Sequence, residues 1–390
     1  MADKQHILRC HGILDIDIIE AKQAVLITNT NKKIIDFESG IWCTALGHNN
    51  DLINKAITSQ LRKVSHLNTR LVSPLAEELA HKLIDLTEFN NGKATFLSSG
   101  SEAVEMAITL AKLVSNKSKL LSFSNSYLSA YSHMSMPRST ETFTEIDFAQ
   151  CNSCTNQHKC HECVLLQHLN FNEIAAFVFE PGNTSGKVLL PNNKLVMYLA
   201  SEVQKHNGLV VVNEVTTGFG RTGKWFGYQH YNISPNIIAM GKALGNGYPI
   251  SAVVMDHSTA LGVENKGYLY AQSHQNDPLG CRIGCEVIDQ LTTNNLIQKS
   301  KELGDYFIKS LLAINSEQIK GVRGRGLMLA LELNRPNLAN TMYDKLLSRG
   351  FLVGYHPIEN ILRFYPTLLI SKQQINSLCN EIAHVLAGLS

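Results

Sequence analysis

The sequence contains no long apolar run. No stretch of its 390 residues approaches the roughly 20 consecutive apolar residues that a membrane-spanning helix needs. The N-terminal sequence MADKQHILRCHG also lacks the apolar core of a secretory signal peptide. We therefore expect neither a membrane span nor export.

The sequence also lacks an excess of charge of either sign. Its 35 Lys and Arg residues nearly balance its 33 Asp and Glu residues, and the net charge is +2. Proteins that bind nucleic acid or anionic membranes usually carry a basic excess, so composition gives no reason to expect such a partner. Hydrophobic and charged shares of 44% and 17% are ordinary for a globular protein, and the length favours two domains that share a cleft.

Nine cysteines without a secretion signal are typical of a reducing compartment, and we expect a cytoplasmic location. Four of them, Cys151, Cys154, Cys160 and Cys163, form a C-x2-C-x5-C-x2-C pattern. Paired C-x2-C turns supply the tetrahedral thiolate set that zinc prefers, and iron–sulfur clusters use similar ligands. The pattern therefore has two interpretations: a structural metal site, for zinc in particular, or a surface loop of reduced thiols.

The most informative stretch runs from residue 208 to residue 247. The valine-rich run 209–212 predicts a buried strand of a parallel sheet, and Asn213 follows at its end. Ligands of open α/β sheets bind at that end of the strands. After a glycine-rich loop, the apolar segment 237–240 leads to Lys242. Two successive strands thus place Asn213 and Lys242 at one edge of the predicted sheet.

A lysine after an apolar strand has two interpretations. It is either a solvated loop residue or an amine held in a partly dry cleft, where its pKa falls and it can form a Schiff base. Enzymes that use pyridoxal phosphate need such a lysine together with a polar partner for the pyridine nitrogen. Lys242 and Asn213 offer this pair.

At this point the sequence resembles a known family. NEVTTGFGRTG at 213–223 and GKALGNGYPISAV at 241–253 are similar to motifs of the class III aminotransferases, the ornithine-, acetylornithine- and 4-aminobutyrate-like enzymes of pyridoxal-phosphate fold type I. The resemblance extends over nearly the whole chain. It implies an α/β fold, with a large domain built on a mainly parallel seven-stranded sheet and a small α+β domain made from both chain ends.

The resemblance also implies the division of the chain. We expect the large cofactor-binding domain to span 49–281 and the small domain to combine 1–48 with 282–390. Apolar runs at 94–97, 120–123, 175–179, 209–212 and 237–240, separated by helical patterns, agree independently with an α/β fold.

The segment ATFLSSGSEAVEMAITLAKL at 94–113 predicts a strand that enters a helix. Small residues before a helix let backbone N–H groups approach an anion, although Ser-Gly-Ser is also a common helix cap. The resemblance implies that Gly100 and Ser101 bind the cofactor phosphate. It further implies that Tyr127 stacks on the pyridine ring and that Ala130 replaces an arginine that binds a distal carboxylate in some members.

Further roles follow from the resemblance alone. Glu180, directly after the strand at 175–179, matches a position of the cofactor cleft in the family. Asn183 stands where the family usually has a glutamine. Val215 and Thr216 border the cofactor, with Thr216 replacing the usual glutamine near its phenolic oxygen. Ser273 replaces a threonine that reaches the cofactor phosphate of the neighbouring subunit, so we expect a homodimer.

Two residues are candidates for contact with substrate. Arg363 stands in the motif LRFYP, and the resemblance implies that it binds the substrate α-carboxylate, for which the planar guanidinium is well suited. Trp42 lies in a segment that lines the substrate side of the cleft in the family. For Trp42 a purely structural place in the core is an equally open interpretation.

The resemblance implies ping-pong transamination. Lys242 would hold pyridoxal phosphate as an internal aldimine, and an amino acid or amine would donate its amino group to a keto acid or aldehyde. Asn213 departs from the usual aspartate and cannot supply the negative charge that keeps the pyridine nitrogen protonated. Two alternatives stay open for that reason: a racemase or epimerase on the same scaffold, or a non-catalytic relative that binds the cofactor or a metal.

Overall fold

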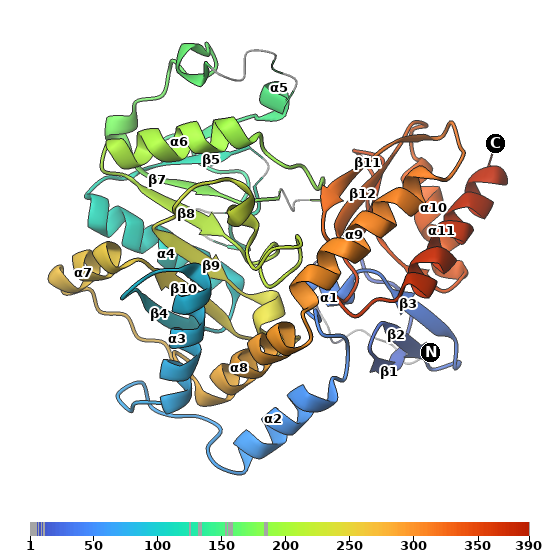
Figure 1. Cartoon of the computed structure of the whole chain (residues 1–390), viewed down its shortest axis with the longest axis horizontal. Helices are drawn as coiled ribbons and strands as arrows, with labels where there is room; N and C mark the ends of the chain where they lie inside the picture. Colours follow the sequence, from blue (N-terminus) through green and yellow to red (C-terminus); the bar gives the residue numbers. More distant parts are fainter. Residues whose placement is uncertain are drawn as a thin grey trace.

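The architecture is α/β, with helices on both faces of a large sheet and two smaller sheets beside it (Figure 1). This computed structural model describes residues 6, 8, 10, 12–124, 126–131, 135–152, 154, 159–182 and 186–389. The strands are β1 (Ile18–Lys22), β2 (Val25–Thr28), β3 (Lys33–Asp36), β4 (Lys93–Leu97), β5 (Lys119–Phe123), β6 (Phe143–Ile146), β7 (Ile174–Phe179), β8 (Leu209–Asn213), β9 (Ile237–Met240), β10 (Ser251–Met255), β11 (Ile319–Arg325), β12 (Met328–Leu333), β13 (Phe351–Leu352), β14 (Gly354–His356) and β15 (Ile361–Phe364).

The helices alternate with these strands through the middle of the chain. They are α1 (Ser39–Trp42), α2 (Asp51–Leu61), α3 (Pro74–Thr87), α4 (Gly100–Ser115), α5 (Ala149–Asn152), α6 (Asn193–Lys205), α7 (His257–Asn265), α8 (Pro278–Thr293), α9 (Leu296–Leu312), α10 (Leu338–Ser348) and α11 (Lys372–Ala387). Short 3₁₀ helices are η2 (Cys160–Glu162), η3 (Phe171–Glu173), η4 (Gly227–His230) and η5 (Lys242–Gly245).

The large sheet has seven strands in the order β4-β10-β9-β8-β7-β5-β6. The five strands from β9 to β6 are parallel neighbours, whereas β10 runs antiparallel to β4 and β9. The predicted mainly parallel seven-stranded sheet is confirmed. Phe179 pairs with Val212 across β7 and β8. The residues that follow them, Glu180 and Asn213, therefore lie side by side at one edge.

Alternating apolar residues bury both faces of this sheet, as the period of a strand requires. Val211 belongs to a cluster with the alanine-rich face of α4 and with α7. Val210 and Val212 point the other way, into a larger cluster that includes α3, α6 and α8. The central strands are therefore buried on both sides, and their polar ends are the natural place for a site.

The small domain contains two four-stranded sheets, in the orders β1-β2-β3-β13 and β11-β12-β15-β14. β2 and β3 form a hairpin around residues 29–31. β3 also pairs in parallel with β13, so the first part of the chain and the last part share one sheet. Figure 1 shows α9, α10 and α11 packed around this domain.

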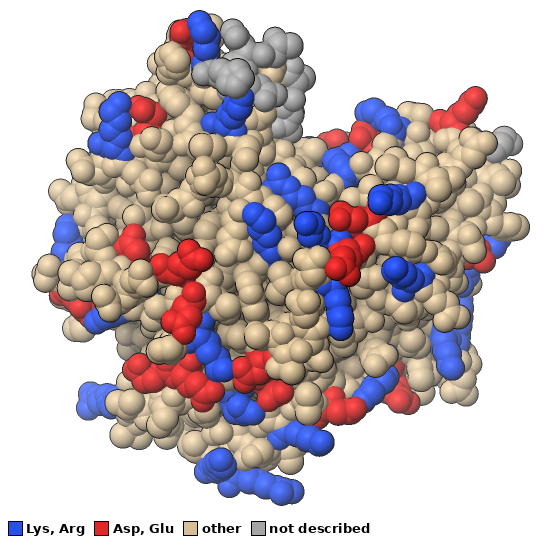
Figure 2. Space-filling view, viewed as in Figure 1, with Lys and Arg blue, Asp and Glu red and all other residues tan. Residues whose placement is uncertain are grey.

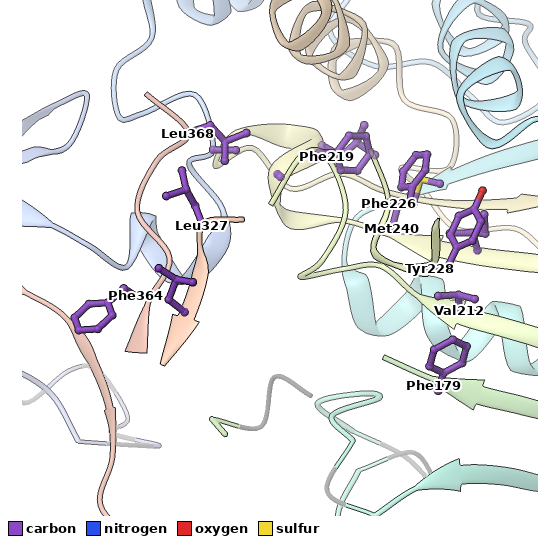
Figure 3. Packing of buried hydrophobic residues seen from close by; sticks show 14 of the residues in the cluster. Phe179, Val212, Phe219, Phe226, Tyr228, Met240, Leu327, Phe364 and Leu368 are labelled. Atoms are coloured by element: carbon purple, nitrogen blue, oxygen red, sulfur yellow. The ribbon is translucent and has the colours of Figure 1, made fainter. Parts of the chain in front are cut away.

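One apolar cluster continues from the large sheet into the small domain. Figure 3 shows Phe179, Val212 and Met240 beside the large sheet and Phe364 and Leu368 on the other side of the cluster. The buried side chain of Arg221, in the loop after β8, helps to join the two regions. The guanidinium of Arg221 donates to the backbone carbonyl oxygens of residues 327 and 366.

Two turns in the last third of the chain depend on left-handed residues. Residues 282–313 form two helices, α8 and α9, because Asn295 adopts a left-handed φ of 51° that no continuous helix accepts. Residues 321–333 form the hairpin β11–β12. Its turn lies at Gly326, with φ 53°, where an added Cβ would lie 2.5 Å from the backbone nitrogen of Gly223.

None of the helices in the described part of the chain is long and apolar enough to cross a membrane. On the face shown in Figure 2, Lys and Arg side chains are interspersed with Asp and Glu side chains. This mixed surface agrees with the small net charge of the chain, +2.

Candidate active site

Lys242 begins the turn that follows β9. It is the first residue of η5, and its backbone is left-handed with φ 44°. The turn ends at Asn246, whose side-chain oxygen accepts from the N–H of Leu46 at 2.8 Å and whose amide donates to the carbonyl of Gly47 at 3.1 Å. These two bonds hold the lysine turn against the chain segment that follows Trp42.

The Lys242 amine occupies a secluded position. Its Nζ atom lies 5.4 Å from the centre of the Trp42 ring. Burial lowers the pKa of Lys242, and the charges of Cys43 and Glu180 oppose part of that effect. Burial therefore increases the fraction of neutral amine, which is the form that attacks a carbonyl carbon.

Trp42 stands at the end of a left-handed turn. The four residues 39–42 of α1 all have positive φ, from 44° to 66°. The carboxylate of Asp36 accepts hydrogen bonds from the N–H groups of residues 38–40 and so holds the turn. Positive φ is unfavourable for a β-branched residue such as Ile41, and strain of this kind clusters at functional sites.

The Trp42 ring joins the lysine to the small domain. It stacks on Tyr365, with ring centres 4.0 Å apart and an interplanar angle of 27°. Trp42 is 7% exposed, and within the described chain its Nε1 atom has no hydrogen-bond partner. The ring is thus buried and also forms a wall beside the amine, which combines the two interpretations left open by the sequence.

Glu180 and Asn213, at the ends of β7 and β8, both bind the backbone of Tyr127. Glu180 accepts from the N–H of Tyr127 at 2.7 Å. The Asn213 amide donates to the carbonyl of Tyr127 at 3.0 Å, while its oxygen accepts from the N–H of Val215 at 3.1 Å. The three predicted cofactor residues Tyr127, Glu180 and Asn213 are therefore brought together, and the Tyr127 ring is left 47% exposed.

The N-terminus of α4 lies at the same edge. Ser99 and Glu102 form a capping box, which satisfies part of the helix start. Within the described chain, the N–H groups of Gly100 and Ser101 carry no such bond, and the Ser101 hydroxyl accepts from the N–H of Ala130 at 2.9 Å. Two backbone donors, one hydroxyl and the positive end of the helix dipole thus point to an anion site.

Val215 and Thr216 follow β8, and Val215 packs against the start of α4. An added Cβ at Gly100 would lie 2.6 Å from a Val215 methyl carbon, so glycine is required at this contact. Thr216 is buried, and its hydroxyl has no partner within the described chain. A buried hydroxyl without a partner suits a polar ligand group in the cleft.

Arg363 lies on β15 in the small domain, where it pairs with Ala330 and Gly354 of the neighbouring strands. Its guanidinium lies 5.6 Å from the centre of the Tyr365 ring, and its buried Nε atom has no partner within the described chain. Glu38 approaches the same place: a Cβ at Gly354 would lie 2.7 Å from Glu38 Oε1 and 3.0 Å from Arg363 Nε. Burial raises the pKa of Glu38 to about 6, and the charge of Arg363 opposes that rise.

Other predicted residues lie apart from this group. Ser273 is exposed in the turn before α8, and within the described chain it forms no hydrogen bond. The four cysteines Cys151, Cys154, Cys160 and Cys163 line a separate cavity under α5 and η2. Asn183 lies outside the described residues.

Some residues of the site were not predicted. Glu38 is one, because its nearness to Arg363 depends on the pairing of distant strands. Asn246 is another, although its place inside the GKALGNG motif and its left-handed φ of 44° are signals that could have found it. Cys43 is a third, since its thiol interacts electrostatically with Lys242.

These groups fit pyridoxal phosphate. The α4 terminus offers donors for a phosphate, Thr216 a free hydroxyl, Asn213 an amide at the strand edge, and Lys242 an amine with a lowered pKa. The cradle at Gly100 leaves no space for a side chain in front of the phosphate donors. The donor set matches an anionic aldehyde ligand, and nothing in it is arranged for a metal.

Comparison with known proteins agrees with this arrangement. The model of the class-III aminotransferases matches residues 9–386. The chain is 29% identical to the acetylornithine aminotransferase of Aquifex aeolicus over 98% of this chain and 100% of that protein. It is 27% identical to the succinylornithine transaminase of Yersinia enterocolitica over 93% of this chain and 90% of that protein.

Solved structures show the same fold. A transaminase from the marine bacterium Virgibacillus superposes with a TM-score of 0.91 at 23% identity, over 99% of this chain and 97% of that chain. The acetylornithine aminotransferase of Elizabethkingia anophelis gives 0.84 at 24% identity, over 98% and 96%.

Proposed function

The chain belongs to the class III aminotransferases, and we propose that Lys242 is the amine with which it moves an amino group from a donor to a carbonyl acceptor. The observation that carries this assignment is the position of Lys242. It is a largely buried lysine with a lowered pKa at the strand edge, beside Glu180 and Asn213. The predicted pyridoxal-phosphate aminotransferase activity is that of the family, and none of the relatives named for this chain is a racemase.

Different residues of the proposed site would bind different parts of the cofactor. Gly100 and Ser101 would hold the phosphate, Tyr127 and Val215 would flank the ring, and Asn213 would face its nitrogen. When bound, pyridoxal phosphate supplies an aldehyde carbon and an electron-withdrawing ring.

The Lys242 amine would hold the cofactor at rest and, when free of it, would move a proton at the substrate carbon. Glu180 lies near enough to interact with the amine electrostatically. Trp42 and Tyr365 exclude water on the opposite side.

The substrate is proposed to be an amino acid whose carboxylate pairs with Arg363. The buried Nε of Arg363, which has no partner within the described chain, supports this role. Ala130, with no cationic side chain, offers no charge for a second carboxylate at that position. The relatives named above act on acylated ornithines, and we place the donor in the same chemical class: an amino acid that carries a carboxylate and one transferable amine, with a keto acid as acceptor.

Lys242 is tested by trapping the cofactor and by a single half-reaction. Borohydride reduction of the loaded protein, followed by peptide mass spectrometry, is expected to find the cofactor mass on Lys242. Lys242→Ala should lose this mass and the amino transfer from every donor in a panel. Lys224→Ala, at an exposed lysine of the neighbouring loop, should keep both. Trapping at another lysine would exclude the assignment.

A homodimer that shares its sites is proposed from Ser273. Its exposure at the turn before α8 leaves its hydroxyl available to a second subunit. Mixed dimers of Lys242→Ala and Ser273→Ala subunits test this, because one of the two sites then contains both intact residues only if Ser273 acts across the interface. Recovery of activity on mixing supports the proposal, and its absence contradicts it.

The cell compartment is proposed to be the cytoplasm. All nine cysteines of the chain are free thiols, which suits a reducing compartment. Fractionation of cells that contain the protein tests this expectation.

A further inference from the structure

The four cysteines between β6 and β7 form two matching turns. The N–H of Cys154 donates to the carbonyl of Cys151 at 3.3 Å, and the N–H of Cys163 donates to the carbonyl of Cys160 at 3.1 Å. Each C-x2-C pair therefore forms the same hydrogen-bonded turn, in which the N–H of the second cysteine donates to the carbonyl of the first. The amino transfer described above uses none of these thiols.

Both turns face one cavity. It has a volume of about 280 Å³, and all four cysteines line it together with Leu166 from the same segment. The thiols of Cys154, Cys160 and Cys163 each lie close enough to Cys151 to interact with it electrostatically. Two separate turns thus supply four sulfur atoms to a single space.

The surroundings place this cavity on the large domain. Asn192 and Leu195, at the start of α6, form its other wall. Cys151, Cys160 and Cys163 also pack against the main apolar core. Figure 1 shows α5 above α6, at the outer end of the large domain.

A pair of disulfides or a reactive redox thiol accounts less well for this cluster than a metal does. No pair is joined as a disulfide, since all four cysteines are free. A redox pair needs two thiols, whereas all four cysteines line the same cavity. Four sulfur ligands in two C-x2-C pairs are the set that tetrahedral Zn²⁺ prefers.

We propose that Cys151, Cys154, Cys160 and Cys163 bind one Zn²⁺ as a tetrathiolate that fastens the segment from α5 to Leu166 onto the start of α6. The four thiols release their protons to solvent as the sulfur–zinc bonds form, and no electron is transferred. Among the described residues, no three of these four sulfurs lie within 4.8 Å of one another. Binding therefore draws the two turns together.

Aromatic packing connects the proposed metal site to the residues of the proposed cofactor site. Phe148, directly before α5, packs on Phe123 with ring centres 4.9 Å apart. Phe123 ends β5, the strand that leads to Tyr127. Fastening α5 thus supports the strand that carries Tyr127 toward Glu180 and Asn213. The metal's role is structural, and it takes no part in the reaction.

The first test is elemental analysis of untagged protein purified without added metal. About one zinc per chain is expected in the wild type, and almost none in Cys154→Ser or Cys160→Ser. Cys10→Ser, at an exposed cysteine outside the segment, should keep its zinc. Cys154→His should recover most of the metal, because imidazole also ligates zinc, and this variant separates lost ligation from misfolding.

The second test is reconstitution with Co²⁺ after chelation. A tetrahedral thiolate site gives intense visible cobalt bands, which Cys160→Ser should lose and Cys10→Ser should keep. Chelated wild type should also unfold at a lower temperature and regain its Tm with Zn²⁺. Wild type that purifies without metal and binds neither ion would overturn the proposal, as would iron with acid-labile sulfide. These readouts do not depend on amino transfer.

Discussion

The Asn213 side chain is a bridge between two backbone groups: its amide donates to the carbonyl of Tyr127 at 3.0 Å while its oxygen accepts from the N–H of Val215 at 3.1 Å. An amide performs both functions at once, whereas a carboxylate has no proton to donate. The asparagine at position 213 therefore has a structural role, in addition to the effect of being uncharged. It fixes the position of Tyr127 from the end of β8.

The first prediction concerns Asn213→Asp. The carboxylate would face the carbonyl of Tyr127 without a donor and would lie beside the buried Glu180, so the free energy of unfolding should fall by about 1–3 kcal/mol. Denaturant unfolding of the cofactor-free protein measures it. Asn334→Asp is the control, because that amide also donates to a carbonyl, of Glu317 at 2.7 Å, but is exposed. Equal effects of the two changes would contradict the bridge.

The second prediction concerns pH and substrate binding. The pKa of Glu38 is raised to about 6 by burial, so the carboxyl is mostly neutral below that pH and charged above it. Charged Glu38 competes with a substrate carboxylate for Arg363. KM for a carboxylate-bearing donor should therefore rise about two- to fivefold as pH increases through 6, with a smaller change in kcat.

Glu38→Gln should remove this pH dependence and leave a low, flat KM. Glu359→Gln is the matched control, because Glu359 pairs with Lys187, which lowers its pKa away from this window. A KM profile for Glu38→Gln that still rises near pH 6 would show that another group titrates.

The third prediction concerns the phosphate cradle. Gly100→Ala places a Cβ 2.6 Å from a Val215 methyl carbon, so the start of α4 and β8 must separate. We expect a loss of about 1–3 kcal/mol in stability and weaker cofactor binding, measured by unfolding and by equilibrium dialysis. Gly321→Ala, where an added Cβ meets nothing within 4 Å, should change neither. Unchanged cofactor affinity in Gly100→Ala would exclude this cradle as the phosphate site.

The fourth prediction concerns Glu214. Its fully buried carboxylate accepts from the Thr217 hydroxyl and from the N–H groups of Gly227 and Tyr228, yet desolvation still raises its pKa to about 7. The unfolded chain ionises near 4.5, so folding loses stability as pH rises from that value toward 7.

Glu214→Gln has no such titration. Between pH 4.5 and 7 the wild type should lose roughly 3 kcal/mol relative to the variant, whatever the offset between them at low pH. Unfolding free energies of both proteins across this range check it. A constant difference would show that the Glu214 carboxyl has the same pKa in the folded protein as in the unfolded chain.

Much of the fold and of the candidate site could be predicted from local sequence patterns. The apolar runs before Asn213 and Lys242 are strands β8 and β9, because valine- and isoleucine-rich segments bounded by turns have few other folded states. The helix start at the Ser-Gly-Ser sequence could also be predicted, because small residues before a helical pattern are a local signal. Each of these features is decided within about ten residues.

The parts that sequence alone did not supply depend on distant pairing. β10 was missed as a strand because its apolar run follows a glycine-rich motif and pairs antiparallel in a parallel context. The nearness of Glu38 to Arg363 depends on β14 pairing with β15 and on the strained turn after Asp36. No local spacing encodes a contact between residues so far apart in the chain.

Arg221 joins the loop after β8 to the small domain, and its partners there are two main-chain oxygens, of residues 327 and 366, and the Ser39 hydroxyl at 3.4 Å. Every amino acid has such an oxygen, so side-chain substitutions at 327 and 366 leave the joint chemically intact. The dependence is largely one-sided: apart from the Ser39 hydroxyl, the groups that the guanidinium contacts place no demand on side-chain identity. The two halves of the active site can thus change their chemistry independently while their spacing stays the same.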